Sequence, residues 1–348
     1  MQKTDLSHVK SVIFSCVGLK VTEAEREFFE QENPFGFILF ARNVDNPDQL
    51  KKLTDDLRGA VGRPDAPVLV DQEGGRVLRL KAPHWFEAPA FGKLGKLFEK
   101  NSEQGIQATR LATRLIARDL TAAGINVDCS PCLDLSFEET SSVIGDRSFN
   151  SDPARVAILG AVVAEEFLNA GIIPVIKHVP GHGRAIVDSH HHLPTVSATR
   201  EELIKTDFDP FQALNKSPWG MTAHIVFDAI DPDRPATQSG QIINEIIRGD
   251  IGFDGLLLTD DLNMQALEGP LDLRASRALE AGVDIILHCS GKIDEMKLVA
   301  GACPKLSDAS IDRILRAEKQ CNVISPPLYD QHSMIKELNS LLSKVEDA

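Results

Sequence analysis

A histidine-rich segment near the middle of the chain carries side chains suited to proton transfer. It reads KHVPGHGRAIVDSHHHLP from Lys177 to Pro194 and contains half of the chain's ten histidines. Asp188 and His190 are two residues apart, so in extended backbone both side chains point to the same side. A carboxylate bound to one imidazole nitrogen fixes the tautomer and frees the other nitrogen for acid–base chemistry. An isolated Asp-X-His more often caps a turn, but a glycine-containing loop after a buried strand favours the catalytic interpretation.

A pair of carboxylates at the end of another apolar run is the second candidate. Asp260 and Asp261 follow Leu256–Thr259, and carboxylates at the end of a buried strand cost free energy unless they are used or paired. Because side chains alternate along a strand, only one of the two can face the axis of a barrel. The other could cap the helix that follows. The pattern alone leaves both assignments open.

Two further segments carry side chains that can bind hydroxyl groups. DQEGGRVLR begins at Asp71, and GDRSF begins at Gly145. Carboxylates and arginines commonly hold neutral sugars through bidentate hydrogen bonds. For Glu73 and Arg76 we prefer a structural interpretation, in which each takes part in an ion pair at the surface.

Neither the histidines nor the cysteines form a complete metal-binding motif. Adjacent side chains of His190-His191-His192 point in opposite directions in extended chain, so three in a row rarely bind one ion. Cys129-Ser-Pro-Cys132 has zinc-like spacing, but no second CxxC and no HxxxH accompanies it. The six cysteines are therefore expected to be reduced and mostly packed as small apolar side chains. We expect neither a metal nor a cofactor.

Most of these candidate side chains follow short apolar segments that recur along the chain. Such segments predict buried parallel strands. Eight such segments are found at residues 11–17, 36–40, 67–71, 125–135, 172–178, 220–227, 255–260 and 283–288. Segments with helical periodicity lie between them, at residues 48–61, 103–123, 152–170, 241–248, 272–281 and 294–302. Three connections, 73–102, 136–151 and 179–197, are long enough to indicate functional loops. Alternation of strand and helix predicts a closed parallel barrel or a large doubly wound sheet.

The positions of ionisable side chains distinguish these two folds. Four predicted strands end in such residues, namely Asp71, Lys177-His178, Asp260-Asp261 and His288. Barrel active sites are built from the ends of several strands, whereas a doubly wound sheet gathers its site at one switch point, normally beside a glycine-rich phosphate loop. The chain has neither GxGxxG nor GxxxxGK[ST]. We predict an α/β fold, a single (β/α)8 TIM barrel over residues 1–302. Residues 303–348 are expected to add helices at 308–320 and 331–346 that pack on or extend from the barrel and form no separate domain.

Charge and hydropathy restrict the partners. The 348 residues carry a formal net charge of −14, which argues against nucleic acid and anionic membranes because both require a basic surface. The apolar segment Val12–Val17 is too short for the core of a signal peptide or for a spanning helix. We therefore expect a cytoplasmic protein. No pattern specifies an oligomer, and a monomer is the expected state.

Four motifs, taken together and in order, resemble those of a known enzyme family. DQEGGRVLR, IGDRSF, KHVPGHG followed by DSH, and GFDGLLLTDDLNM are similar to the motifs of bacterial β-N-acetylglucosaminidases of glycoside hydrolase family 3. The resemblance runs from Ser11 to Ala302 and is closest to the single-domain type that acts in peptidoglycan recycling. It implies a TIM barrel without the sandwich domain of larger members, and a retaining double-displacement mechanism.

The resemblance also implies roles for individual residues. In the family, the first aspartate of the TDD motif is the nucleophile, which selects Asp260, and the histidine of DSH is the general acid/base, which is His190 with Asp188 as its partner. The positions that hold the terminal N-acetylglucosamine match Asp71, Arg79, Arg147, Lys177 and His178. A histidine pKa of about 6.5 suits a group that acts first as an acid and then as a base. The implied substrate is an anhydro-muropeptide fragment of the cell wall.

Two departures from the family pattern lie in the acid/base loop. The family often has an acidic residue after GHG, where this chain has Arg184, and small or apolar residues after DSH, where it has His191-His192. Arg184 favours a second hypothesis, phosphorolysis with the same Asp/His machinery, because histidine repels incoming phosphate less than glutamate does. A non-catalytic sugar-binding barrel and a metal-dependent amidohydrolase are the remaining alternatives. The presence of Asp260, Asp188 and His190 argues against the sugar-binding barrel, and treatment with a chelator tests the amidohydrolase.

Overall fold

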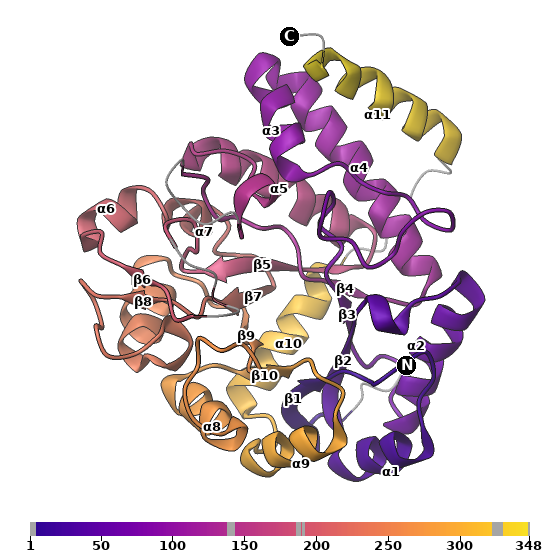
Figure 1. The fold of residues 1–348 in the computed structure, drawn as a ribbon, viewed down its shortest axis with the longest axis vertical. Helices are drawn as coiled ribbons and strands as arrows, with labels where there is room; N and C mark the ends of the chain where they lie inside the picture. The colour runs from indigo at the N-terminus through magenta and orange to yellow at the C-terminus, as the bar shows by residue number, and fades with distance from the viewer. Residues whose placement is uncertain (1–4, 138–142, 186–188, 190–191, 322–329, 347–348) are drawn as a thin grey trace.

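Eight parallel strands close into a barrel at the centre of the molecule, and helices surround them (Figure 1). The computed structural model describes residues 5–137, 143–185, 189, 192–321 and 330–346. The strands of the barrel are β1 (Lys10–Phe14), β2 (Pro34–Leu39), β3 (Val68–Val70), β4 (Val127–Asp128), β5 (Ile173–Val179), β7 (Trp219–Thr222), β9 (Leu256–Asp261) and β10 (Ile285–His288). Their order around the barrel is β1-β10-β9-β7-β5-β4-β3-β2. The predicted (β/α)8 barrel is confirmed.

The strands are mostly apolar because both of their faces are covered, and the polar residues of β5, β9 and β10 lie toward their C-terminal ends. Every residue of β2, β3 and β5 is buried, as a parallel sheet between a filled interior and a layer of helices requires. In β1, Val12 and Phe14 pack outward against the helices, whereas Ile13 points into the barrel. Phe35 and Trp219 meet inside the barrel with ring centroids 5.6 Å apart.

The helices that cover the barrel include those that the helical periodicity predicts. These are α2 (Pro47–Ala60), α4 (Ser102–Ala122), α5 (Pro153–Asn169), the π-type helix η4 (Ile242–Asp250), α8 (Leu271–Ala281) and α9 (Ile293–Ala302). Three further helices, α1 (Glu23–Glu32), α6 (Arg200–Lys205) and α7 (Asp209–Ala213), were not predicted from the sequence. Local signals fix several of their starts. Asn46 and Asp152 accept backbone N–H groups at the first turns of α2 and α5, and each helix has proline at its first position.

One helix lies where the sequence predicts only a loop. α3 (Phe91–Lys100) occupies the end of segment 73–102, so the prediction of an irregular connection is wrong there. Gly92 and Gly95 lower the intrinsic helical propensity of this stretch. The helix is stabilised instead by burial of Phe91, Leu94 and Leu97, whose spacing of three residues is a helical signal that the prediction overlooked.

Two predicted strands are shorter than expected. The segment 220–227 divides into β7 and the separate β8 (Val226–Phe227), which leaves the barrel and pairs with β6 (Thr195–Val196). The segment 125–135 contributes only β4 to the barrel. After β4 the chain turns toward β5, where the Leu133 amide donates a hydrogen bond to the Lys177 carbonyl.

The C-terminal helices cover one end and one side of the barrel. Ile314 and Ala317 of α10 (Asp308–Gln320) join the apolar cluster of the barrel interior, and Arg316 binds the Asp254 carbonyl just before β9. α10 therefore closes the N-terminal end of the barrel and leaves the C-terminal end open. α11 (Gln331–Glu346) lies along α3 and α4 at the top of Figure 1. The domain boundary at residue 302 remains a prediction. No helix in the described part of the chain is long and apolar enough to cross a membrane.

Candidate active site

Six of the eight predicted site residues line a single pocket at the C-terminal ends of the strands. They are Asp71, Arg79, Arg147, Lys177, His178 and Asp260. The pocket has a volume of about 250 Å³ and an apolar wall that includes Phe40, Met264 and Leu287. The other two predicted residues, Asp188 and His190, lie outside the described residues. Side chains that converge from β3, β5 and β9 form the arrangement that barrel enzymes use for catalysis.

A buried network of alternating charges forms one wall of the pocket. The Lys177 ammonium lies 2.9 Å from Asp71 Oδ1 and 2.6 Å from Glu73 Oε1. Arg79 Nη2 donates to the second oxygen of Asp71 at 3.0 Å. Arg147 binds both oxygens of Glu73, with Nε 2.9 Å from Oε2 and Nη2 2.7 Å from Oε1. Each anion thus contacts two cations, which offsets the free-energy cost of removing the charges from water.

These contacts keep the network ionised. Burial raises the pKa of the Asp71 carboxyl, but Lys177 and Arg79 outweigh this effect and hold the pKa well below its usual range. Burial also raises the pKa of Glu73, while Arg147 and Lys177 lower it to about 2. Burial lowers the pKa of Lys177, and the two carboxylates raise it above its ordinary value. At neutral pH the side chains of this network are therefore all charged.

Glu73 and Arg76 differ in their surroundings, although the sequence predicts a surface ion pair for both. The Glu73 side chain is only 1% exposed, so this prediction is wrong for Glu73. Arg76 pairs with Asp146 at 3.0 Å, and about half of each side chain is exposed, as predicted. The β3 strand ends before Asp71, and the turn that follows brings Glu73 back beneath Lys177, which strand alternation cannot anticipate.

Asp260 and Asp261 take different places at the end of β9. Asp260 Oδ2 lies 4.0 Å from His178 Nε2, and Oδ1 accepts the Asp261 amide at 2.8 Å. Asp261 also borders the pocket, but its Oδ1 accepts the amides of Asn263 and Cys289, each at 3.1 Å. Asp261 therefore caps a turn and not a helix, because α8 begins ten residues later at Leu271.

The two carboxyls also differ in pKa. Burial raises the pKa of Asp260, but His178, His224 and the Asp261 amide outweigh burial and lower it. Asp260 is therefore ionised at neutral pH. Burial, together with the charge of Asp260, raises the pKa of Asp261 to about 6. Of the two, only Asp260 combines full ionisation with a free oxygen that faces the pocket.

His178 is oriented by a carboxylate that the sequence reasoning missed. Asp134 Oδ2 lies 2.6 Å from His178 Nδ1, and the same carboxylate accepts the backbone amides of His178 and His182. These donors and the charge of His178 outweigh burial and hold the pKa of Asp134 far below its usual range. An ionised carboxylate only accepts, so Nδ1 carries the proton and Nε2 is directed at Asp260. The sequence did offer a signal for Asp134, because it is a charged residue within the apolar segment 125–135.

His224 is the second residue that the sequence reasoning missed. It follows β7, is fully buried, and lies 2.7 Å from Thr237 Oγ1 through Nδ1 and 3.1 Å from the Asp261 carbonyl through Nε2. Burial lowers its pKa, so the ring is neutral at pH 7. It fixes the backbone of Asp261, whose amide in turn binds Asp260.

Comparison with known proteins identifies the family. Residues 4–317 match the glycosyl hydrolase family 3 N terminal domain. This chain belongs to glycosyl hydrolase family 3. The beta-hexosaminidase of Alkalilimnicola ehrlichii is 39% identical over 277 residues, which span 78% of each chain. That of Aromatoleum aromaticum is 32% identical over 97% of this chain and 95% of its own. The crystal structure of NagZ from Neisseria gonorrhoeae in complex with N-trifluoroacetyl-D-glucosamine is similar with a TM-score of 0.86 at 29% identity, over 96% of this chain and 99% of that one.

Family membership confirms the resemblance that the four motifs indicate, and it makes the chain a glycoside hydrolase. In this family 3 hydrolase the pocket lies at the end of the barrel that α10 leaves open. A larger hollow of about 820 Å³ lies on the other side of η2 (Gly145–Arg147). Of the described residues that line it, none was predicted to act in the site.

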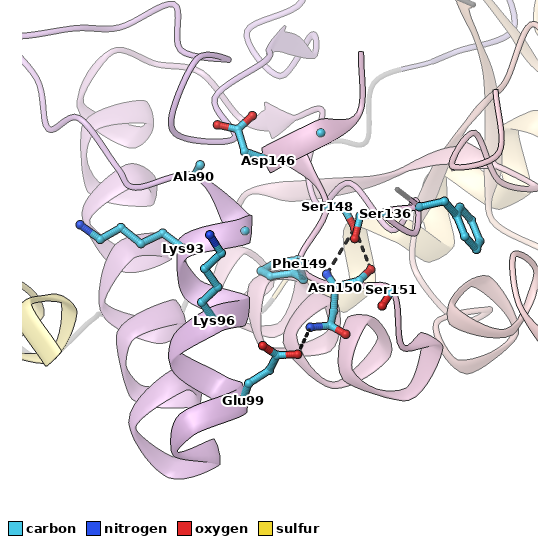
Figure 2. Close-up of a pocket in the computed structure, with 13 residues that line it drawn as sticks. Ala90, Lys93, Lys96, Glu99, Ser136, Asp146, Ser148, Phe149, Asn150 and Ser151 are labelled. Atoms are coloured by element: carbon cyan, nitrogen blue, oxygen red, sulfur yellow. Dashed lines mark hydrogen bonds between the residues drawn. The ribbon is translucent and has the colours of Figure 1, made fainter. Parts of the chain in front are cut away.

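The wall of this hollow positions Arg147. Figure 2 shows Lys93, Lys96 and Glu99 of α3 on one side and Asn150 with Phe149 on the other. Phe149 stacks on Phe91 with ring centroids 4.3 Å apart, and Asn150 donates to Glu99 at 2.9 Å. α3 thereby fixes the segment that begins with η2 and carries Arg147 into the pocket of the family 3 hydrolase.

One group of described residues in this family 3 hydrolase has the spacing of a metal site. The ligand atoms of Cys132, Asp134 and His178 lie within 4.8 Å of one another. Cys132 Sγ and His178 Nδ1 both already bind Asp134, at 3.2 and 2.6 Å, so hydrogen bonds account for this arrangement. Five of the six cysteines are buried, which confirms that most of them are packed as small apolar side chains.

Proposed function

We propose that this family 3 hydrolase is a retaining exo-β-N-acetylglucosaminidase with Asp260 as its nucleophile. The observation that carries the proposal is the partly buried, ionised Asp260 carboxylate, which lines the same small pocket as the Lys177 network. Relatives named beta-hexosaminidase support this activity. The similar NagZ structure in complex with N-trifluoroacetyl-D-glucosamine supports an N-acylated glucosamine as the bound sugar.

The size and polarity of the pocket suit one terminal sugar. A volume of about 250 Å³ is slightly below the roughly 300–1,000 Å³ that pockets for drug-sized ligands span, which suits one sugar ring better than a longer chain. We assign Asp71, Arg79, Arg147, Lys177 and His178 to binding of the sugar.

Catalysis is proposed to proceed by double displacement. Because the Asp261 amide holds Oδ1 of Asp260, Oδ2 is the oxygen that attacks the anomeric carbon. A bond forms between Oδ2 and that carbon while the bond to the aglycone oxygen breaks, and the aglycone takes a proton from the general acid. In the second step water attacks the same carbon, gives its proton to the general base, and releases the Asp260 carboxylate. Two inversions retain the β configuration.

We assign the acid and base roles to His190, with Asp188 as its partner. Both lie outside the described residues, so these assignments rest on the family motif. An imidazole in this role avoids the repulsion with the Asp260 carboxylate that a second carboxylate would introduce.

The natural substrate is proposed to be an anhydro-muropeptide fragment of the cell wall, and the site of action the cytoplasm. Acceptance of such a fragment would place the hydrolase in peptidoglycan recycling. Hydrolysis of a purified fragment by the wild type, and fractionation of cells that express the chain, test the two statements separately.

Phosphorolysis is less well supported, because Arg184 is already occupied. Its Nε lies 2.7 Å from Asp207 Oδ2 and its Nη2 2.9 Å from Glu202, and the guanidinium stacks on the Phe137 ring at 4.6 Å. Two carboxylates thus neutralise the cation that made phosphate attractive as an acceptor.

The decisive assay uses p-nitrophenyl β-N-acetylglucosaminide with wild type, Asp260→Ala and Asp260→Asn in phosphate-free buffer. We expect wild-type release that survives EDTA, an initial β-configured product by NMR, and loss of about 10³-fold or more in both variants. Release that requires phosphate would favour the phosphorylase, and loss with EDTA restored by zinc would favour a metal enzyme. An initial α product, or full activity in Asp260→Ala, would overturn the proposed mechanism.

A further inference from the structure

Ser189 is held from two sides although it lies in the acid/base loop. Its side chain is buried, and Oγ lies 3.0 Å from His182 Nε2. Its carbonyl accepts the Ala266 amide at 3.3 Å, in the turn that follows Asp261. In the sequence Ser189 stands between Asp188 and His190, so each of those residues is one peptide bond from a fixed point.

His182, which fixes Ser189, is itself rigidly placed. Its backbone amide donates to Asp134 Oδ1 at 2.6 Å, and its ring meets the His178 ring edge to face at 5.5 Å. Burial, together with the charge of His178, lowers the pKa of His182 to about 4. The imidazole is therefore neutral at pH 7 and serves as a hydrogen-bonding group, with no ionic role.

Stability alone does not explain a histidine at position 182. Among the described residues its Nδ1 is buried without a hydrogen-bond partner, and an unsatisfied buried nitrogen costs free energy. An apolar ring of similar size would avoid that cost. What an apolar ring cannot do is bind Ser189, so this hydrogen bond is the property that distinguishes histidine here.

We propose that His182 and Ser189 form a latch that positions the acid/base residues for proton transfer. This inference rests on the proposed function, because the His182–Ser189 contact can affect proton transfer only if the neighbouring Asp188 and His190 carry it out. A continuous set of contacts runs from Asp260 through His178 and Asp134 to His182 and Ser189. The carboxylate Asp134 thus orients a pocket residue with one oxygen and the latch with the other. His182 is a positioning residue and touches no reacting atom.

The latch can be tested through the leaving group, because a general acid matters only when the departing oxygen needs a proton. The 2,4-dinitrophenyl β-N-acetylglucosaminide leaves as a stable phenolate, whereas the phenyl glycoside requires protonation. For His182→Phe and Ser189→Ala we expect kcat/KM for the phenyl substrate to fall about 10- to 100-fold. For the dinitrophenyl substrate we expect kcat/KM within about threefold of wild type. Ser189→Thr, which keeps the hydroxyl, should restore the phenyl rate.

A buried histidine elsewhere in the barrel provides a matched control. His288 is fully buried, lies 3.0 Å from Ser290 Oγ, and has a pKa lowered by burial to about 4. His288→Phe removes the same kind of His–Ser contact outside the acid/base loop. We expect it to change the rates of the two substrates by the same factor.

A double-mutant cycle keeps the inference falsifiable if a single variant is unstable. Because one contact is removed either way, His182→Phe/Ser189→Ala should be no slower on the phenyl substrate than the slower single variant. Equal losses on both substrates, no loss on either, or multiplicative losses in the double variant would overturn the latch. If the wild type hydrolyses neither glycoside, the proposed function fails instead, and the two failures are thereby distinguished.

Discussion

At the scale of single residues, burial decides how much a charged side chain contributes to the stability of the protein. Glu73 and Arg76 stand three positions apart in one motif, yet one joins a buried network and the other an exposed pair. Removing one partner of a buried network leaves an uncompensated charge, whereas an exposed pair contributes little. Sequence spacing does not distinguish the two cases, because the turn after Asp71 determines which side chain points inward.

Replacement of Glu73 by alanine is therefore expected to destabilise the protein strongly. Glu73→Ala leaves Lys177 and Arg147 each without one anionic contact, and we expect the free energy of unfolding to fall by about 3–5 kcal/mol. Asp146→Ala, which removes the exposed partner of Arg76, should cost less than about 1 kcal/mol. Urea denaturation at pH 7 measures both. Similar losses in the two variants would show that the buried network contributes no more to stability than the exposed ion pair does.

Asp261 should make the free energy of unfolding fall as pH rises, whereas a carboxylate in an ion pair makes it rise. Its pKa is raised from 3.8 to about 6 by burial, so the folded state holds a proton that the unfolded state has lost. Stability from this group is present below pH 4 and is lost as pH rises through 6. Asp261→Asn cannot ionise, so its stability relative to wild type should increase by about 2 kcal/mol between pH 4 and 7. A pH-independent difference in denaturation free energy would contradict the shift.

At the scale of elements, the sequence predicts the barrel strands well and the connections less well. Buried parallel strands are apolar on both faces, so the segments 36–40 and 255–260 lie within two residues of β2 and β9. The candidate pocket was predictable to the extent that its residues end these strands. Asp134 and His224 were missed because their roles depend on contacts between elements, with His178 and Asp261.

The missed helix α3 provides a sharp test of how an element positions the pocket. A Cβ built on Gly95 would overlap the Phe149 carbonyl oxygen, whereas one built on Gly59 of α2 meets nothing within 4 Å. Gly95→Ala must push α3 away from Phe149 and move η2, so we expect a loss of about 1–3 kcal/mol in stability and a higher KM. Gly59→Ala should instead stabilise the protein by about 0.5–1 kcal/mol. Thermal unfolding with Michaelis kinetics compares them. Equal behaviour would mean that α3 does not constrain η2.

At the scale of the whole molecule, the C-terminal helices connect the periphery to the site. α11 buries Met334, Leu338 and Leu342 against the outer core, a spacing of one helical face. It packs on α3 and α4, and α3 supports η2 with Arg147. The sequence indicates the helix and its apolar face, but periodicity alone does not say which surface receives that face.

Deletion of residues 330–348 tests whether α11 belongs to the barrel domain. Burial of each of the three apolar side chains contributes about 1.5–3 kcal/mol relative to exposure, so the shortened chain should unfold at clearly lower urea in a single transition. Leu338→Ala should lose about 2–5 kcal/mol, whereas Ser340→Ala, on the exposed face, should stay within about 0.5 kcal/mol of wild type. Because α3 loses a neighbour, KM for the p-nitrophenyl substrate should rise in the shortened chain. If the C-terminal helices formed an independent unit, the barrel's transition and its KM would both be unchanged by the deletion.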